Sequence, residues 1–172
     1  MRTLSVATVA FAALLAFASA SKTPRDYCQR TLVVTELFDP DGFVVPLALR
    51  NASAVDITVL IGYTSGFQDP VVWGGSGTSS RKAGTLMSTC FLQSLTATGG
   101  MVNYCSSTLA FGEYGSISWM GPFYDEQGEE FHNGITGGTG IYLGASGSVR
   151  TNVLKTGEAW RYQFTLLDRP KC

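Results

Sequence analysis

Apolar and polar positions alternate in short runs along most of the chain, with Gly, Pro, Asn and Asp between the runs. The last run is the clearest, because Trp160, Tyr162, Phe164 and Leu166 alternate with polar side chains and so share one strand face. The runs cover residues 31–38, 43–50, 56–64, 84–96, 101–111, 115–121, 134–143, 147–154 and 159–167. No convincing amphipathic helix interrupts them, so the pattern predicts an all-β domain of eight or nine strands.

Eight strands can close into an eight-stranded antiparallel β-barrel, which removes exposed edges and leaves room inside for side chains or one small ligand. The aromatic row of the last strand then either fills the core or lines a ligand cavity. Between Phe67 and Gly84 the sequence shows no regular period, and we expect a Gly/Ser loop that covers a barrel mouth. The 20 glycines among 172 residues fit tight turns, bulges and close strand approach in such a fold.

The N-terminal stretch has the features of a secretory signal peptide. Arg2 precedes an uncharged apolar run, and Ala18-Ser19-Ala20 fits cleavage before Ser21. We therefore assign residues 1–20 to a signal peptide and 21–172 to one extracellular domain, with no membrane span because the apolar run is too short. Asn51 opens an N-glycosylation sequon, so it is a candidate glycan site.

Four cysteines lie in the mature part, and secretion favours two disulfides among three possible pairings. We favour Cys28–Cys172, which ties the ends of the domain, and Cys90–Cys105 across a hairpin. If 86–96 and 101–111 pair around a turn between Ala97 and Thr98, the two hairpin cysteines stand opposite each other.

Charge and composition exclude several functions. The formal net charge is -1 without any run of like charge, so there is no electrostatic footprint for nucleic acid. His132 is the only histidine and no C-x-x-C occurs, which argues against a metal site or a hydrolytic triad. The acidic residues Asp125, Glu126, Glu129 and Glu130 read as a solvated loop.

Glu36 is the carboxyl group most suited to chemistry. Alternation places it on the same face as Leu32, Val34 and Phe38, an otherwise apolar row. Burial there would raise its pKa and make it a candidate proton acceptor or a partner for a developing cation. The alternative is that this strand lies at a sheet edge and leaves Glu36 in solvent.

Two motifs in the second half, FGEYGSISWMGPF at 111–123 and ITGGTGIYLGASG at 135–147, resemble the allene oxide cyclase barrel family. The second motif is also similar to that of the plant dirigent proteins, and the match covers roughly residues 84–167. The resemblance implies an eight-stranded antiparallel barrel with a hydrophobic cavity, often assembled as a trimer. It also supports the Cys28–Cys172 link.

Within that resemblance, Glu36 matches the strand glutamate thought to stabilise positive charge as an epoxide opens, although a one-residue slip would turn it outward. The family's strand cysteine resembles Cys90. Ser146 stands where dirigent proteins usually carry an arginine that orients the substrate, which counts against lignan-type coupling. Our candidate ligand contacts are Trp119, Tyr142, Trp160, Tyr162 and Phe164.

Two hypotheses follow from the sequence. In the first, the protein is a secreted barrel that binds a small hydrophobic or phenolic ligand, without a cofactor, and steers its cyclisation or stereoselective coupling as an isomerase, in a homotrimer. In the second, it is a non-catalytic extracellular interaction protein whose barrel is filled by its own side chains. A cavity beside Glu36 would distinguish the first from the second.

Overall fold

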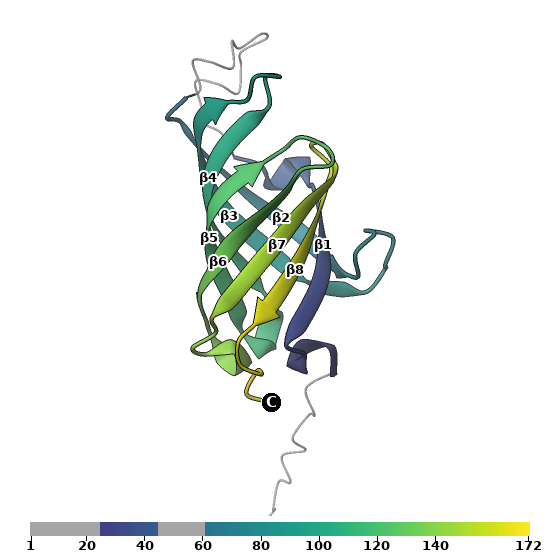
Figure 1. Cartoon of the computed structure of the whole chain (residues 1–172). Helices are drawn as coiled ribbons and strands as arrows, with labels where there is room; N and C mark the ends of the chain where they lie inside the picture. Colours follow the sequence, from purple (N-terminus) through teal and green to yellow (C-terminus); the bar gives the residue numbers. More distant parts are fainter. Residues whose placement is uncertain (1–24, 45–60) are drawn as a thin grey trace, which may run out of the picture.

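The computed structural model describes residues 25–44 and 61–172, and it shows one closed antiparallel β-barrel (Figure 1). Its strands are β1 (Thr31–Leu37), β2 (Thr64–Trp73), β3 (Lys82–Leu95), β4 (Met101–Ala110), β5 (Ser116–Tyr124), β6 (Glu130–Gly138), β7 (Gly147–Lys155) and β8 (Ala159–Leu166). Short 3-10 turns are η1 (Arg25–Cys28), η2 (Pro40–Gly42), η4 (Gly112–Tyr114) and η5 (Gly140–Tyr142). None of the helical segments in the described ranges is long and apolar enough to cross a membrane.

Each strand pairs with its sequence neighbour, and β1 closes the barrel against β8 from Thr31↔Thr165 to Leu37↔Ala159. The prediction of an eight-stranded antiparallel barrel is therefore confirmed. Because β1 also pairs with β2 on its other side, it is not an edge strand. The alternative that placed Glu36 in solvent at a sheet edge is wrong.

The barrel has two distinct ends. The chain termini of the domain meet at what we call the closed end, together with η1, η4 and η5 (Figure 1). We call the other end the open end; there β1, β3, β5 and β7 finish, and the β3–β4 hairpin projects beyond the other strands (Figure 1).

The largest error of the sequence prediction concerns β2. We expected a loop after Phe67, but the strand continues to Trp73, with Phe67, Asp69, Val71 and Trp73 on its inner face. Pro70 lies on the exposed face of this strand, and the carboxyl of Asp69 is buried inside.

The predicted strands over 43–50 and 56–64 fall mostly outside the described residues, as do the signal peptide and Asn51. Within the described part, Val44 forms a single bridge with Gly66, and regular pairing begins only at Thr64.

The glycine-rich segment forms a strand followed by a corner, not the continuous strand predicted over 134–143. β6 ends at Gly138, and η5 turns the chain so that Tyr142 enters the core at the closed end. A Cβ at Gly138 would lie 2.5 Å from the Tyr142 carbonyl oxygen, and Gly140 adopts a φ of +59°. These two positions require glycine because of close backbone approach and a left-handed turn.

Aromatic side chains fill the barrel at its closed end. Tyr27 of η1 packs at a ring-centroid distance of 5.0 Å from Trp73, and Phe111 lies 5.1 Å from Tyr142. The Tyr142 hydroxyl also donates a 2.9 Å hydrogen bond to the Tyr27 carbonyl, which anchors η1 across the barrel end. This half of the interior is a packed core.

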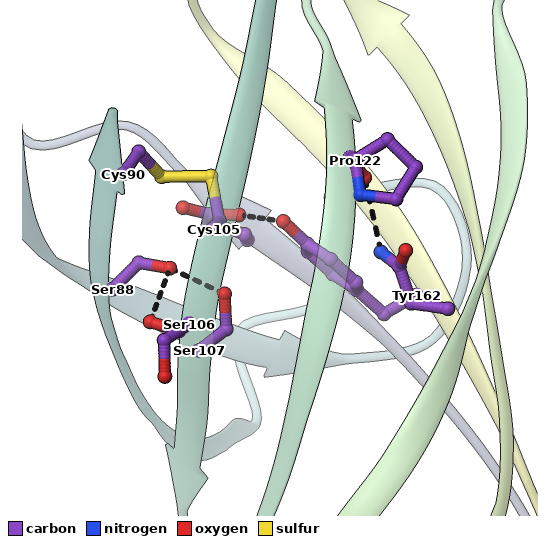
Figure 2. The surroundings of a disulfide bond; sticks show 9 residues. Ser88, Cys90, Cys105, Ser106, Ser107, Pro122 and Tyr162 are labelled. Carbon is purple, nitrogen blue, oxygen red and sulfur yellow. Dashed lines mark hydrogen bonds between the residues drawn. A yellow bond between two sulfur atoms is a disulfide. The ribbon is translucent and has the colours of Figure 1, made fainter. Parts of the chain in front are cut away.

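Both predicted disulfides are present. Cys28 is bonded to Cys172 at the closed end, and Cys90 is bonded to Cys105 between directly opposed residues of β3 and β4. Figure 2 shows the second bond bridging the two strands. Two residues further along each strand, Ser88 and Ser107 are hydrogen-bonded to each other. The two sulfur-bearing side chains of this pair are 3% exposed, so the bond belongs to the barrel interior.

Candidate functional site

A cavity of about 250 Å³ occupies the interior toward the open end. Side chains from most of the strands and from the connections at that end line it, namely Glu36, Phe38, Phe43, Ser65, Phe67, Asp69, Cys90, Met101, Asn103, Phe123, Asp125, Gly157 and Trp160. The volume lies just below the range of about 300–1,000 Å³ typical of pockets for drug-sized ligands. A compact ligand, or one part of a longer ligand, fits such a space.

Glu36 is one of the residues that line this cavity. Alternation along β1 turns Leu32, Val34 and Glu36 inward, and the glutamate side chain is only 1% exposed. The Tyr162 hydroxyl donates a 2.5 Å hydrogen bond to Glu36 Oε2. Among the described residues the other oxygen, Oε1, has no hydrogen-bond partner. The hydrogen bond thus fixes Oε2, whereas Oε1 is left without a hydrogen bond at the cavity.

The surroundings of Glu36 favour its neutral form. Burial raises the pKa of the carboxyl well above its ordinary value, the adjacent Asp69 carboxyl raises it further, and the Tyr162 hydrogen bond lowers it only in part. Because Oε2 already accepts the tyrosine proton, the acid proton of neutral Glu36 belongs on Oε1. Neutral Glu36 therefore offers a carboxylic O–H donor to the neighbouring Asp69 carboxyl or to a ligand in the cavity.

Two aspartates accompany Glu36 at the cavity, and the sequence analysis did not single out either. The backbone N–H of Asp39 donates to Asp69 Oδ1 at 2.9 Å, and that of Gly157 donates to Asp125 Oδ1 at 3.1 Å. Asp125 is half-buried, contrary to the solvated loop predicted for it, and burial raises its pKa. An inward position in the alternation of β2 was the available signal for Asp69; Asp125 lies just beyond β5 and has no such pattern.

The remaining polar groups at the cavity come from two strands. Trp160 Nε1 is buried without a partner at hydrogen-bonding distance in the described part of the chain, although its N–H lowers the pKa of Asp125. Asn103 of β4 adds an amide, and Cys90 brings the disulfide to the wall. In this barrel the cysteine that resembles the family's strand cysteine is therefore half of a disulfide.

The structure brings together only some of the predicted ligand contacts. Trp160 lines the cavity. Tyr162 is hydrogen-bonded to Glu36, and Figure 2 shows the tyrosine ring reaching into the barrel interior. Trp119 and Phe164 pack against each other at 5.1 Å in the core and do not line the cavity. Tyr142 lies at the closed end.

Ser146, at the position of the dirigent arginine, is exposed in the turn before β7 at the closed end. The departure from the dirigent motif therefore lies away from the Glu36 cavity. In residues 25–44 and 61–172 no three His, Cys, Asp or Glu side chains come together in a way that could hold a metal ion.

The raised pKa of Glu36 predicts an unusual pH dependence of stability. The folded state holds the Glu36 proton more tightly than the unfolded state does. The resulting contribution to the free energy of unfolding is complete below the unfolded pKa of about 4.3 and is lost as pH rises toward the folded pKa. The loss is about 1.4 kcal/mol for each pH unit in that window. We expect Glu36→Gln to be more stable than the parent at alkaline pH, with the difference shrinking on acidification.

Urea denaturation of both proteins over a pH series measures this difference. Glu113→Gln, at an exposed carboxyl of the closed end, is the matched control and should leave the pH profile unchanged. A parallel profile for Glu36→Gln and the parent would show that Glu36 does not have a raised pKa.

The fold and the cavity define the class of protein as a closed β-barrel with an internal ligand-sized cavity, and solved structures with this fold are known. A pyocyanin demethylase superimposes with a TM-score of 0.56 at 19% identity, covering 79% of this chain and 98% of its own. The pterocarpan synthase dirigent protein PsPTS1 gives a TM-score of 0.59 at 19% identity, with coverages of 77% and 90%. AbnU, an exo-specific intermolecular Diels-Alderase, gives 0.50 at 18% identity, with coverages of 79% and 97%.

No family model matches the chain, and no curated protein matches its sequence. At these identities the likeness shows the fold alone. The chain thus shares its barrel fold with these proteins, and membership of the allene oxide cyclase family stays a prediction.

Proposed function

We propose that the barrel binds a small hydrophobic or phenolic ligand in the Glu36 cavity and steers its cyclisation or stereoselective coupling. The observation that carries the proposal is the buried, unpartnered Oε1 of Glu36 at the wall of a largely apolar cavity. A buried polar atom without a partner costs free energy, so its retention is better explained by a ligand than by packing.

The proposed chemistry needs two contributions from the chain. The cavity wall holds the ligand in one folded geometry, which lowers the entropic part of the barrier and selects one product enantiomer. Neutral Glu36 donates a hydrogen bond or a proton to an oxygen that gains negative charge as bonds rearrange. No redox step is involved, so the activity is that of an isomerase when the ligand rearranges alone.

Two structural neighbours support this proposal, since one is a pterocarpan synthase dirigent protein and the other is an intermolecular Diels-Alderase. The competing hypothesis, a non-catalytic interaction protein with a filled barrel, is supported by the closed end, where aromatic side chains do fill the interior. The cavity beside Glu36 favours ligand binding instead.

The test measures the enantiomeric composition of products formed in the presence of the purified protein. Two probe reactions cover the proposed chemistry, the cyclisation of a fatty-acid allene oxide and the coupling of phenoxy radicals from a hydroxycinnamyl alcohol. We expect an enantiomeric excess in one of them that grows with protein concentration. Racemic products from both reactions at saturating protein would refute the steering function.

We also propose that the domain acts outside the cell after removal of residues 1–20. Two disulfides in a small barrel are typical of oxidising compartments, which supports this localisation. Expression of the full chain in a secreting eukaryotic host, followed by mass spectrometry of the medium, should find an N-terminus at Ser21 and reports whether Asn51 carries a glycan.

A homotrimer is the assembly we propose, formed through the outer faces of β3, β4 and β5. Between Ala83 and Tyr124 the only charged residue is Glu113, which lies in η4 and not on a strand. Met87 and Phe91 of β3 and Met120 of β5 are 41–44% exposed on this outer face. Depletion of charge together with exposed Met and Phe side chains is typical of interfaces.

Met120→Arg is therefore expected to convert trimers into monomers, because a charge buried at an interface without a partner is costly. Thr165→Arg, on the exposed face of β8, is the control and should leave the trimer intact. Sedimentation velocity distinguishes the species, and a parent protein that stays monomeric at high micromolar concentration would contradict the assembly.

A further inference from the structure

The charges at the cavity are of one sign. Glu36, Asp69 and Asp125 all line it, and none of the described residues that line it is a lysine, an arginine or a histidine. The negative charges of Asp69 and Asp125 each contribute to the raised pKa of Glu36, so the three carboxyl groups act on one another electrically. A ligand entering this space meets negative potential that no basic group of the described wall offsets.

This arrangement discriminates between ligands by charge. A ligand carboxylate would lose its hydration and face like charges, which is unfavourable in a poorly solvated site. An organic cation would be attracted by the same carboxylates. Its N–H groups would also donate a hydrogen bond to Glu36 Oε1, which lacks a partner.

The apolar part of the wall suits the same ligand. Phe38, Phe67, Phe123 and Trp160 contribute aromatic rings, and those of Phe123 and Trp160 lie 5.8 Å apart. Aromatic rings attract cations through their quadrupole, and the attraction is stronger where the cation is desolvated. Carboxylates beside aromatic rings are the usual means by which proteins bind organic ammonium groups.

We propose that the ligand of this cavity is a hydrophobic organic cation, such as a protonated amine on an aromatic skeleton, and that ligands whose carboxylate would lie inside the cavity are rejected. The proposal rests on the proposed ligand-binding function and names the substrate class of the same site. It also sets this barrel apart from one that accepts a free fatty acid, because a fatty-acid carboxylate would have to lie outside the described part of the cavity.

Three probes with one skeleton test the proposal: phenylpropylamine, phenylpropanol and phenylpropanoate, which are cationic, neutral and anionic at neutral pH. Isothermal titration calorimetry of the oxidised protein should show the amine binding at least about tenfold more tightly than the alcohol, with no detectable binding of the propanoate. Titrations in buffers of different ionisation enthalpy should show proton release with the amine, because the bound cation favours ionised Glu36.

Variants assign the preference to the cavity. Asp69→Asn and Asp125→Asn should each reduce the amine-to-alcohol ratio of affinities several-fold, whereas Glu113→Gln at the closed end should not. The proton-release measurement needs no variant, so the proposal stays testable if a substitution prevents folding.

The outcomes separate this inference from the proposed function. If the alcohol binds and the amine binds no more tightly, the cation preference is refuted and ligand binding stands. If the propanoate binds as tightly as the amine, or if Glu113→Gln lowers the ratio as much as the cavity variants do, the inference is likewise refuted. If none of the three probes binds, both the inference and the proposed ligand-binding cavity fail.

Discussion

Replacing Cys28 and Cys172 together by alanine is expected to lower the free energy of unfolding by about 5 kcal/mol. The disulfide joins residues 144 positions apart, so it restricts almost the whole unfolded chain. In the chain-entropy account the stabilisation grows with the length of the closed loop. The same bond holds η1 against the barrel, where Tyr27 packs on Trp73 and Phe111.

Urea denaturation measures the effect, and the Cys90→Ala, Cys105→Ala double variant is the matched comparison. Its loop is short, with a sequence separation of 15, and the expected loss is about 3 kcal/mol. Each figure is a large share of the total stability of a domain, which is about 5–15 kcal/mol. If the hairpin pair proves the more stabilising of the two, loop length does not govern stability in this barrel.

The alternating rows were what made the barrel predictable from sequence. In β8 the alternation predicted for Trp160, Tyr162 and Phe164 is present in the structure, because one face of a barrel strand is buried and the other faces solvent. The hairpin register was equally accessible, since two cysteines of opposed strands can bond only in a narrow set of registers. The inward direction of Glu36 followed from the same period.

The parts of the site that sequence reasoning missed are those where a local rule is broken. Asp69 interrupts the apolar row of β2 and precedes a proline, so the segment resembled a loop even though each side chain keeps its proper face. Asp125 lies beyond the end of β5, and only the fold brings it to Glu36. Both exceptions are found at the cavity, which is where a sequence is expected to depart from the rules for stable packing.

These two departures also change the meaning of Glu36. A single carboxyl in an apolar row would be a partner for positive charge whenever it is ionised. Burial, together with the nearby Asp69 and Asp125, makes the neutral acid the favoured form in the free protein, and the hydrogen bond from the Tyr162 hydroxyl opposes this only in part. The same group can then donate a proton to a neutral ligand, or release that proton when a cation binds.

Glu36→Gln is expected to slow the steered reaction by about a hundredfold or more, the usual contribution of a positioned general acid. Glutamine keeps an acceptor for the Tyr162 hydroxyl and an N–H donor toward the cavity, but it has no acid proton to give. Binding of a neutral ligand should therefore change only a few-fold while kcat falls. Single-turnover kinetics with whichever probe reaction gives enantioenriched product measures both quantities.

The pH profile distinguishes an acid role from a purely structural one. If neutral Glu36 is the proton donor, kcat falls as pH rises through its raised pKa, and the fall is absent in Glu36→Gln. Tyr162→Phe removes the hydrogen bond that lowers this pKa, so it should move the fall to higher pH while leaving the low-pH rate near that of the parent. A Glu36→Gln variant with the parent's rate and product enantiomer would show that Glu36 is not the proton donor of the reaction.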